Sequence, residues 1–195
     1  MKKLLITAFE PFGGEEINAS LLVLERLPEV IGEWNISKLA VPVVFDKAAG
    51  EVIAKAEEIK PEAILCLGQA AGRSKVTPEY VGINFRNARI ADNAGLQPLR
   101  EKIVPDGPDA YFSTLPVFDM AEAITKNDLP GEVSYSAGTY VCNDLLYSLL
   151  HHYNGTNVRV AFMHLPLSPK QVTNFQPCME ISDMVDAVVS AIEAL

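Results

Sequence analysis

A cysteine, a histidine and a glutamate in this sequence are of types that could carry out nucleophilic chemistry together. Cys142 follows Gly138 and Thr139 in a stretch typical of a turn that leads into a helix. With Thr139 as the N-cap, Cys142 lies in the first helical turn, where unpaired N–H groups and the helix dipole stabilise an anion. We therefore expect its thiol to ionise more readily than a free cysteine, whose pKa is about 8.5. A buried structural cysteine is the alternative.

His164 directly follows the apolar run of residues 158–163. That run predicts a buried strand, which places His164 at the carboxyl end of the strand, where open α/β sheets build their sites. A histidine with a purely structural role fits the same position.

Glu79 lies in the Gly- and Pro-rich segment that begins at Gly68, just before a short strand-like stretch. A carboxylate beside a histidine fixes the tautomer of the ring and stabilises the imidazolium that forms during nucleophilic catalysis. An exposed loop acid is the alternative. If Cys142, His164 and Glu79 meet, they are of the types that carry out nucleophilic catalysis together.

Two phenylalanines, Phe9 and Phe12, flank a stiff loop that ends in Gly13-Gly14. The glycine spacing matches neither GxGxxG nor GxxxxGK[ST], so the sequence gives little support to phosphate binding. The rings could wall a flat small ligand, or they could fill the gap between the loop and the following helix.

The elements that must position these residues alternate between strands and helices along most of the chain. We expect strands near 4–8, 34–44, 63–67, 80–85, 133–136 and 158–163, and helices near 18–27, 46–60, 120–126, 140–153 and 181–195. This alternation predicts an α/β fold in a single domain, residues 1–195, with a mainly parallel twisted sheet and helices on both faces.

The composition excludes several functional classes. The chain has 195 residues, of which 49% are hydrophobic, and a net charge of −9, which disfavours binding to nucleic acid. No stretch of about 18 apolar residues predicts a membrane span. The three cysteines form no CxxC motif, so we expect neither a disulfide framework nor a metal site, and free thiols fit a reducing cytoplasm.

Taken together, five segments resemble the pyroglutamyl-peptidase I (pyrrolidone-carboxylate peptidase) family of cysteine peptidases, in the order of that family and over essentially the whole chain. The segment that ends in Val141-Cys142-Asn143 is the most specific match. The five segments are 8–20, 68–84, 88–93, 134–143 and 162–166.

The resemblance implies a role for each matching residue, on a sheet of the phosphorylase/hydrolase type. It makes Cys142 the nucleophile, His164 the general base and acid, and Glu79 the orienting carboxylate. It also implies substrate-binding roles for Phe9 and Phe12, which flank the pyrrolidone ring, for Asn18 and Gln69 near the ring, and for Arg89 close to the catalytic centre.

The resemblance further implies peptides or amides with N-terminal pyroglutamate as substrates, no cofactor, and a homo-oligomer, a tetramer in many members. The chain departs from the family at several positions, of which two adjoin the glutamate. Tyr80 stands where a basic residue usually follows, and Gly82 stands for alanine; Ala8, Ala19 and Ala91 also depart from the family pattern.

Other functions stay open from the sequence. One is a cysteine hydrolase with a different acyl specificity, and another is a non-catalytic protein that binds a small ligand on the same fold. A phosphorylase-like enzyme is a third, although the chain lacks a convincing phosphate-binding cluster.

Overall fold

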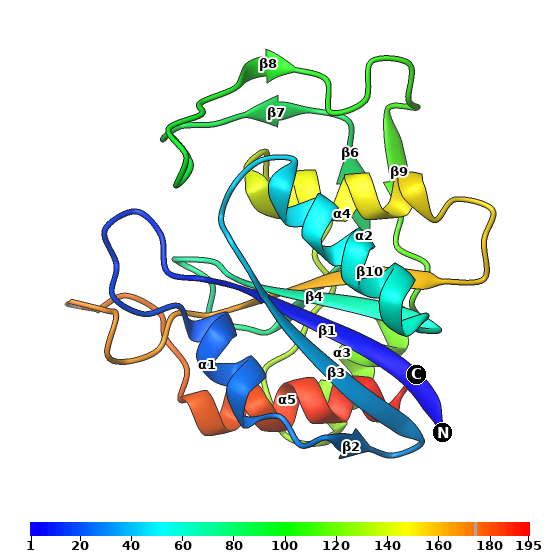
Figure 1. Ribbon diagram of the computed structural model, residues 1–195. Helices are drawn as coiled ribbons and strands as arrows, with labels where there is room; N and C mark the ends of the chain where they lie inside the picture. Colours follow the sequence, from blue (N-terminus) through cyan, green and yellow to red (C-terminus); the bar gives the residue numbers. More distant parts are fainter. Residues whose placement is uncertain (174) are drawn as a thin grey trace.

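A six-stranded sheet in the order β2-β3-β1-β4-β10-β5 runs through the centre of the computed structural model, which describes residues 1–173 and 175–195 (Figure 1). The four inner strands are parallel, and both edge strands pair in the antiparallel sense. The strands are β1 (Lys2–Phe9), β2 (Val30–Ile31), β3 (Trp34–Val41), β4 (Ala63–Gln69), β5 (Thr77–Glu79) and β10 (Arg159–Leu165).

Helices cover both faces of this sheet, as the alternation along the chain predicts (Figure 1). One layer contains α1 (Ala19–Arg26), α3 (Val117–Lys126) and α5 (Ile181–Glu193), and the other contains α2 (Lys47–Ile59) and α4 (Val141–His152). Side chains alternate between the layers along each strand. In β1, Leu4 packs with the first layer and Leu5 with the second, so apolar side chains occupy both faces of the strand.

The segment between β5 and α3 forms two small antiparallel sheets beside α4. These are β6 (Val81–Ile83) with β9 (Ala110–Phe112), and β7 (Arg86–Asn87) with β8 (Leu99–Glu101). The buried amide of Asn84 holds the connection: it donates to Val104 O at 2.7 Å and to Gly107 O at 3.2 Å, and it accepts from Ile103 N at 2.8 Å. One side chain thus replaces a regular ladder of backbone hydrogen bonds.

The predicted α/β architecture is confirmed, and two local predictions are wrong. Residues 133–136 form no strand; only an isolated bridge joins Ser134 to Glu79. Thr139 is not the N-cap of α4, because Tyr140 occupies that position and the Thr139 hydroxyl instead donates to Asn87 O at 2.9 Å. Within the described residues, no helix is both long and apolar enough to cross a membrane.

Candidate active site

The alternation of side chains in the sheet brings His164 and Cys142 to the same face. His164 is the penultimate residue of β10, and Phe162, two residues earlier, belongs to the cluster under α2 and α4. Because residues two apart point the same way in a strand, the His164 ring faces this layer too. Cys142 is the second residue of α4, at the edge of the sheet where the parallel strands end.

Gly68 in β4 makes room for both groups. It pairs with His164 across the parallel strands. A β-carbon at Gly68 would lie 3.3 Å from Cys142 Sγ and only 2.6 Å from Cζ of Phe162. The ring of Phe162 in turn packs against that of His164, with centroids 4.7 Å apart. The sulfur and the imidazole are therefore gathered around the same glycine and the same aromatic ring.

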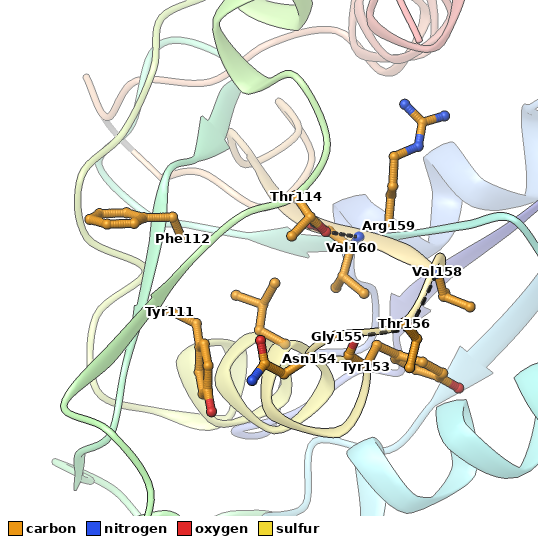
Figure 2. Close-up of a pocket in the computed structure, with 11 residues that line it drawn as sticks. Tyr111, Phe112, Thr114, Tyr153, Asn154, Gly155, Thr156, Val158, Arg159 and Val160 are labelled. Carbon is orange, nitrogen blue, oxygen red and sulfur yellow. Dashed lines mark hydrogen bonds between the residues drawn. The ribbon is translucent and has the colours of Figure 1, made fainter.

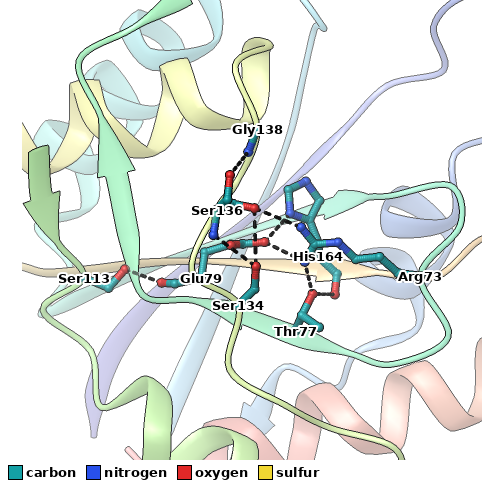
Figure 3. Close-up of polar contacts among 8 residues, drawn as sticks. All are labelled: Arg73, Thr77, Glu79, Ser113, Ser134, Ser136, Gly138 and His164. Atoms are coloured by element: carbon teal, nitrogen blue, oxygen red, sulfur yellow. Dashed lines mark hydrogen bonds and ion pairs between the residues drawn. The ribbon is translucent and has the colours of Figure 1, made fainter.

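Glu79 reaches His164 from the antiparallel edge strand β5. Glu79 is paired with Phe162 in that ladder, so His164 is its diagonal neighbour on the same face. The Nδ1 atom of His164 lies 2.7 Å from Oε1 of the fully buried Glu79 (Figure 3). A carboxylate at Nδ1 fixes the ring so that Nε2 is the nitrogen available for proton transfer.

Arg73 adds a cation to this pair, as Figure 3 shows. Its guanidinium donates to Glu79 Oε1 at 2.7 Å, to Ser136 O at 3.1 Å and to the hydroxyl of Thr77. No motif in the sequence gave Arg73 a separate role. The signal for it was weak, because a charged residue in a Gly-rich loop is usually solvated and its partners lie on other segments.

The charges around the pair favour an ionised glutamate and a neutral histidine. Burial alone would raise the pKa of Glu79, but the hydrogen bond and charge of His164, together with Ser134 and Arg73, lower it. Burial lowers the pKa of His164 and the charge of Arg73 adds to this, against the opposing effect of Glu79. A neutral imidazole can accept a proton.

The thiol of Cys142 does not have the lowered pKa that its place at a helix start predicts. Burial, with a further contribution from the charge of Glu79, raises the pKa of Cys142 to about 12. The N–H groups at the helix start favour the thiolate, but the loss of water around the buried sulfur outweighs them. The resting thiol is therefore protonated and needs a base, which the neutral imidazole of His164 can supply.

Comparisons with known proteins identify the family of the chain. The family model described as pyroglutamyl peptidase matches residues 2–195. The chain belongs to the pyroglutamyl peptidase family. The predicted resemblance is thereby confirmed.

The curated relatives of this chain include a pyrrolidone-carboxylate peptidase of Thermoanaerobacter sp. (strain X514). It is 45% identical to this chain, and the match covers 99% of this chain and 97% of the relative. Among solved structures, pyroglutamyl peptidase I of Bacillus amyloliquefaciens has a TM-score of 0.95 at 38% identity, covering 100% of this chain and 96% of that one. Pyrrolidone carboxyl peptidase from Thermococcus litoralis has a TM-score of 0.94 at 38% identity, covering 100% and 93%.

The two phenylalanines that resemble ring-binding residues of the pyroglutamyl peptidase family lie at different depths. Phe9 is buried in the core, and its ring centroid is 6.3 Å from that of Phe162. Phe12 is partly exposed, and its ring lies 6.2 Å from that of Tyr140, two residues before Cys142. An apolar wall made by Phe12 and Tyr140 therefore adjoins the start of α4, whereas Phe9 packs against Phe162 in the core.

Asn18 and Gln69 make hydrogen bonds that connect the segments next to this wall. Asn18 is the N-cap of α1, accepting from Ser20 N at 3.0 Å, and its amide donates to Glu10 O at 3.1 Å. Gln69 Oε1 accepts from Ala19 N and from Gln171 Nε2, both at 2.8 Å. Gln171 belongs to no motif in the sequence and was not predicted at this site. Among residues 1–173 and 175–195, no hydrogen bond uses Gln69 Nε2.

Arg89 is exposed, and none of the hydrogen bonds or ion pairs described for residues 1–173 and 175–195 involves its side chain. Cys66 is buried in β4, and Cys178 is exposed in a loop. The described residues contain no group of three His, Cys, Asp or Glu side chains arranged to hold a metal ion.

A separate pocket of about 140 Å³ lies at the amino end of β10, lined in part by Tyr111, Tyr153 and Arg159 (Figure 2). Arg159 begins β10, whereas His164 almost ends it. Five residues of strand span about 16 Å, so this pocket lies toward the opposite edge of the sheet from Cys142 and His164. It is not part of the candidate active site.

Proposed function

We propose that this chain is a cysteine peptidase that removes an N-terminal pyroglutamyl residue from peptides or amides through a thioester intermediate. The observation that carries the proposal is the 2.7 Å contact between His164 Nδ1 and Glu79 Oε1, on the face where Cys142 lies over Gly68. Family membership supports the choice of substrate, because the curated relatives are named for action on pyrrolidone carboxylate.

In the acylation step, His164 Nε2 takes the proton of the Cys142 thiol as the sulfur attacks the pyroglutamyl carbonyl carbon. The first hydrogen bond within α4 runs from Asp144 N to Tyr140 O, at 3.1 Å. The N–H groups of residues 141–143 precede it and are available to hold the developing oxyanion. The carbon–nitrogen bond then breaks, the leaving amine takes the proton from His164, and a thioester remains.

In the deacylation step, His164 takes a proton from water as the water oxygen attacks the thioester carbonyl. The carbon–sulfur bond breaks, the sulfur recovers the proton from His164, and free pyroglutamate leaves. Glu79 keeps the ring oriented and stabilises its charged form in both steps.

The substrate ring is a neutral lactam, which suits a pocket with apolar walls and a few polar groups. Phe12 and Tyr140 supply the apolar wall, and Nε2 of Gln69, which takes part in no hydrogen bond among the described residues, supplies a donor for a ring carbonyl. Burying such a carbonyl without a partner would cost about 1–3 kcal/mol. Arg89 contributes to substrate binding from the exposed segment that follows β7. A hydrogen bond from Asn87 N to Thr139 O, at 3.0 Å, connects this segment to the start of α4.

The proposal extends to a homotetramer and to a cytoplasmic setting. The resemblance supports the tetramer, and the free thiols of Cys66, Cys142 and Cys178 suit a reducing compartment.

A panel of chromogenic amides tests the choice of substrate. The purified chain is assayed with the pyroglutamyl derivative and with prolyl, alanyl, glutamyl and leucyl derivatives at equal concentration. The proposal predicts preference for the pyroglutamyl amide by kcat/KM. Equal or better hydrolysis of another derivative would show a different acyl specificity, and no hydrolysis at all would favour a binding protein.

A further inference from the structure

Arg73 touches three of the segments that build the candidate active site. Its guanidinium donates to Glu79 Oε1 on β5 and to Ser136 O in the loop that leads to Cys142. It also donates to the Thr77 hydroxyl, which lies 3.4 Å from the backbone oxygen of His164. One side chain therefore links the strand of the glutamate, the strand of the histidine and the approach to the cysteine.

Arg73 and His164 share one carboxylate oxygen. Both the guanidinium and Nδ1 lie 2.7 Å from Oε1 of Glu79. A buried carboxylate that accepts two charge-assisted or polar hydrogen bonds at one oxygen is held in one rotamer, and its ionised form is favoured. The guanidinium thus fixes the same atom that fixes the His164 ring.

We infer that Arg73 is a positioning residue for the reaction: its guanidinium holds the Glu79 carboxylate in place for His164 and fastens that pair to the loop before Cys142. The inference rests on the proposed function. Arg73 acts through Glu79 and not on the substrate, so its loss should lower kcat and leave KM nearly unchanged.

The geometry also explains why a lysine would be a poor replacement. The planar guanidinium presents donors in a fixed fork, and in this structure NH1 serves Glu79 while NH2 serves Ser136. A lysine ammonium is a point charge on a flexible stem and cannot bridge the two acceptors in the same way. Arg73→Lys therefore keeps the charge but loses the link between Glu79 and the loop.

If the Arg73 side chain is truncated, we expect a small cation to be able to take the place of its guanidinium. Arg73 lines a solvent-accessible pocket of about 280 Å³, through which such a cation could enter. That pocket is also lined by Gly72, Lys75 and Ser134, among others. Arg73→Ala would open a path from the pocket to the Glu79 carboxylate, and free guanidinium fits the space left by the missing group.

The test is chemical rescue, with the full-length chain and a chromogenic pyroglutamyl amide. Arg73→Ala should lower kcat by about 10²-fold, the lower end of what general acid–base catalysis contributes. Millimolar guanidinium should restore a large part of that loss, whereas methylammonium at the same concentration should restore much less. Lys75→Gln is the matched control, since Lys75 borders the same pocket but pairs with Glu132.

The pH profile of kcat/KM gives a second readout that a merely structural role would not move. The charge of Arg73 lowers the pKa of His164, so Arg73→Gln should shift the acid limb to higher pH. Arg73→Lys should shift it less while still losing kcat. The shift supports the inference even if Arg73→Ala folds poorly.

The outcomes separate this inference from the proposed function. If the unaltered chain does not hydrolyse the pyroglutamyl amide, the proposed function fails. If the unaltered chain is active and Arg73→Ala keeps its kcat, or if Arg73→Gln leaves the acid limb in place and guanidinium rescues nothing, the positioning role of Arg73 is overturned.

Discussion

Cys142 Sγ lies over Gly68, 3.3 Å from the point that a β-carbon at position 68 would occupy. The same β-carbon would lie 2.6 Å from Phe162 Cζ, closer than real contacts allow. The absence of a side chain at position 68 is therefore what lets the helix start and the histidine strand approach each other.

Gly68→Ala should abolish most activity and destabilise the fold. The added methyl must displace Phe162 or Cys142, and overpacking of this kind costs about 1–3 kcal/mol. Urea denaturation measures the change in the free energy of unfolding, and the chromogenic assay measures activity.

Gly50→Ala is the matched control. Gly50 is exposed in α2 and a β-carbon there meets nothing within 4 Å. Because alanine lowers the conformational entropy of the unfolded chain, the free energy of unfolding of this variant should rise by about 0.5–1 kcal/mol, and its activity should be unchanged. A Gly68→Ala variant as stable and active as Gly50→Ala would contradict the packing described around Cys142.

Glu79→Gln should reduce kcat strongly, by about 10²- to 10⁴-fold, because an amide does not stabilise the imidazolium and can select the wrong tautomer. The charge of Glu79 raises the pKa of His164, so its removal lowers that pKa further. Activity that needs neutral His164 should then persist to lower pH. The acid limb of kcat/KM measures this; an acid limb displaced to higher pH would contradict the account.

The thiols should differ in reactivity toward iodoacetamide. The pKa of Cys142 is raised to about 12, mainly by burial, so little thiolate is present at neutral pH. Cys178 is exposed and should be alkylated first. Peptide mapping by mass spectrometry, at limiting reagent and neutral pH, gives the order; faster modification of Cys142 would show that the sulfur is ionised at rest.

Asp144→Ala should be costly to stability. Its fully buried carboxylate lies 2.6 Å from Nε of Arg86, whose side chain is only 9% exposed. Removing Asp144 leaves the Arg86 guanidinium with only its exposed partner Asp46, which we expect to cost about 3 kcal/mol, the lower end of the range for breaking a buried ion pair. Asp46 also pairs with Arg86 but is 69% exposed, so Asp46→Ala should cost less than about 1 kcal/mol. Equal losses for the two variants by urea denaturation would show that burial of Asp144 matters little.

The sheet and its helices could be predicted from the sequence because apolar patterns are local signals. Residues 63–67 are apolar without a break, residues 4–8 are apolar except for Thr7, and both form inner strands of the parallel sheet. Ser134 shows the limit of such signals: residues 133–136 have the composition of a strand, yet Ser134 makes only a single bridge with Glu79.

The candidate site was less predictable where it depends on contacts between distant segments. Neither the pairing of Arg73 with Ser136 nor the hydrogen bond from Gln171 to Gln69 leaves a pattern in the sequence. The acidity of Cys142 was predicted in the wrong direction because the local helix start favours an anion, whereas burial, a property of the whole fold, opposes it.

The nucleophile is tested most directly by the rate at which purified Cys142→Ala releases a chromophore from a pyroglutamyl amide, measured beside the unaltered chain. The account predicts rapid release by the unaltered chain and no release above background by the variant, with circular dichroism showing that both are folded. Release by Cys142→Ala at a rate near that of the unaltered chain would contradict it.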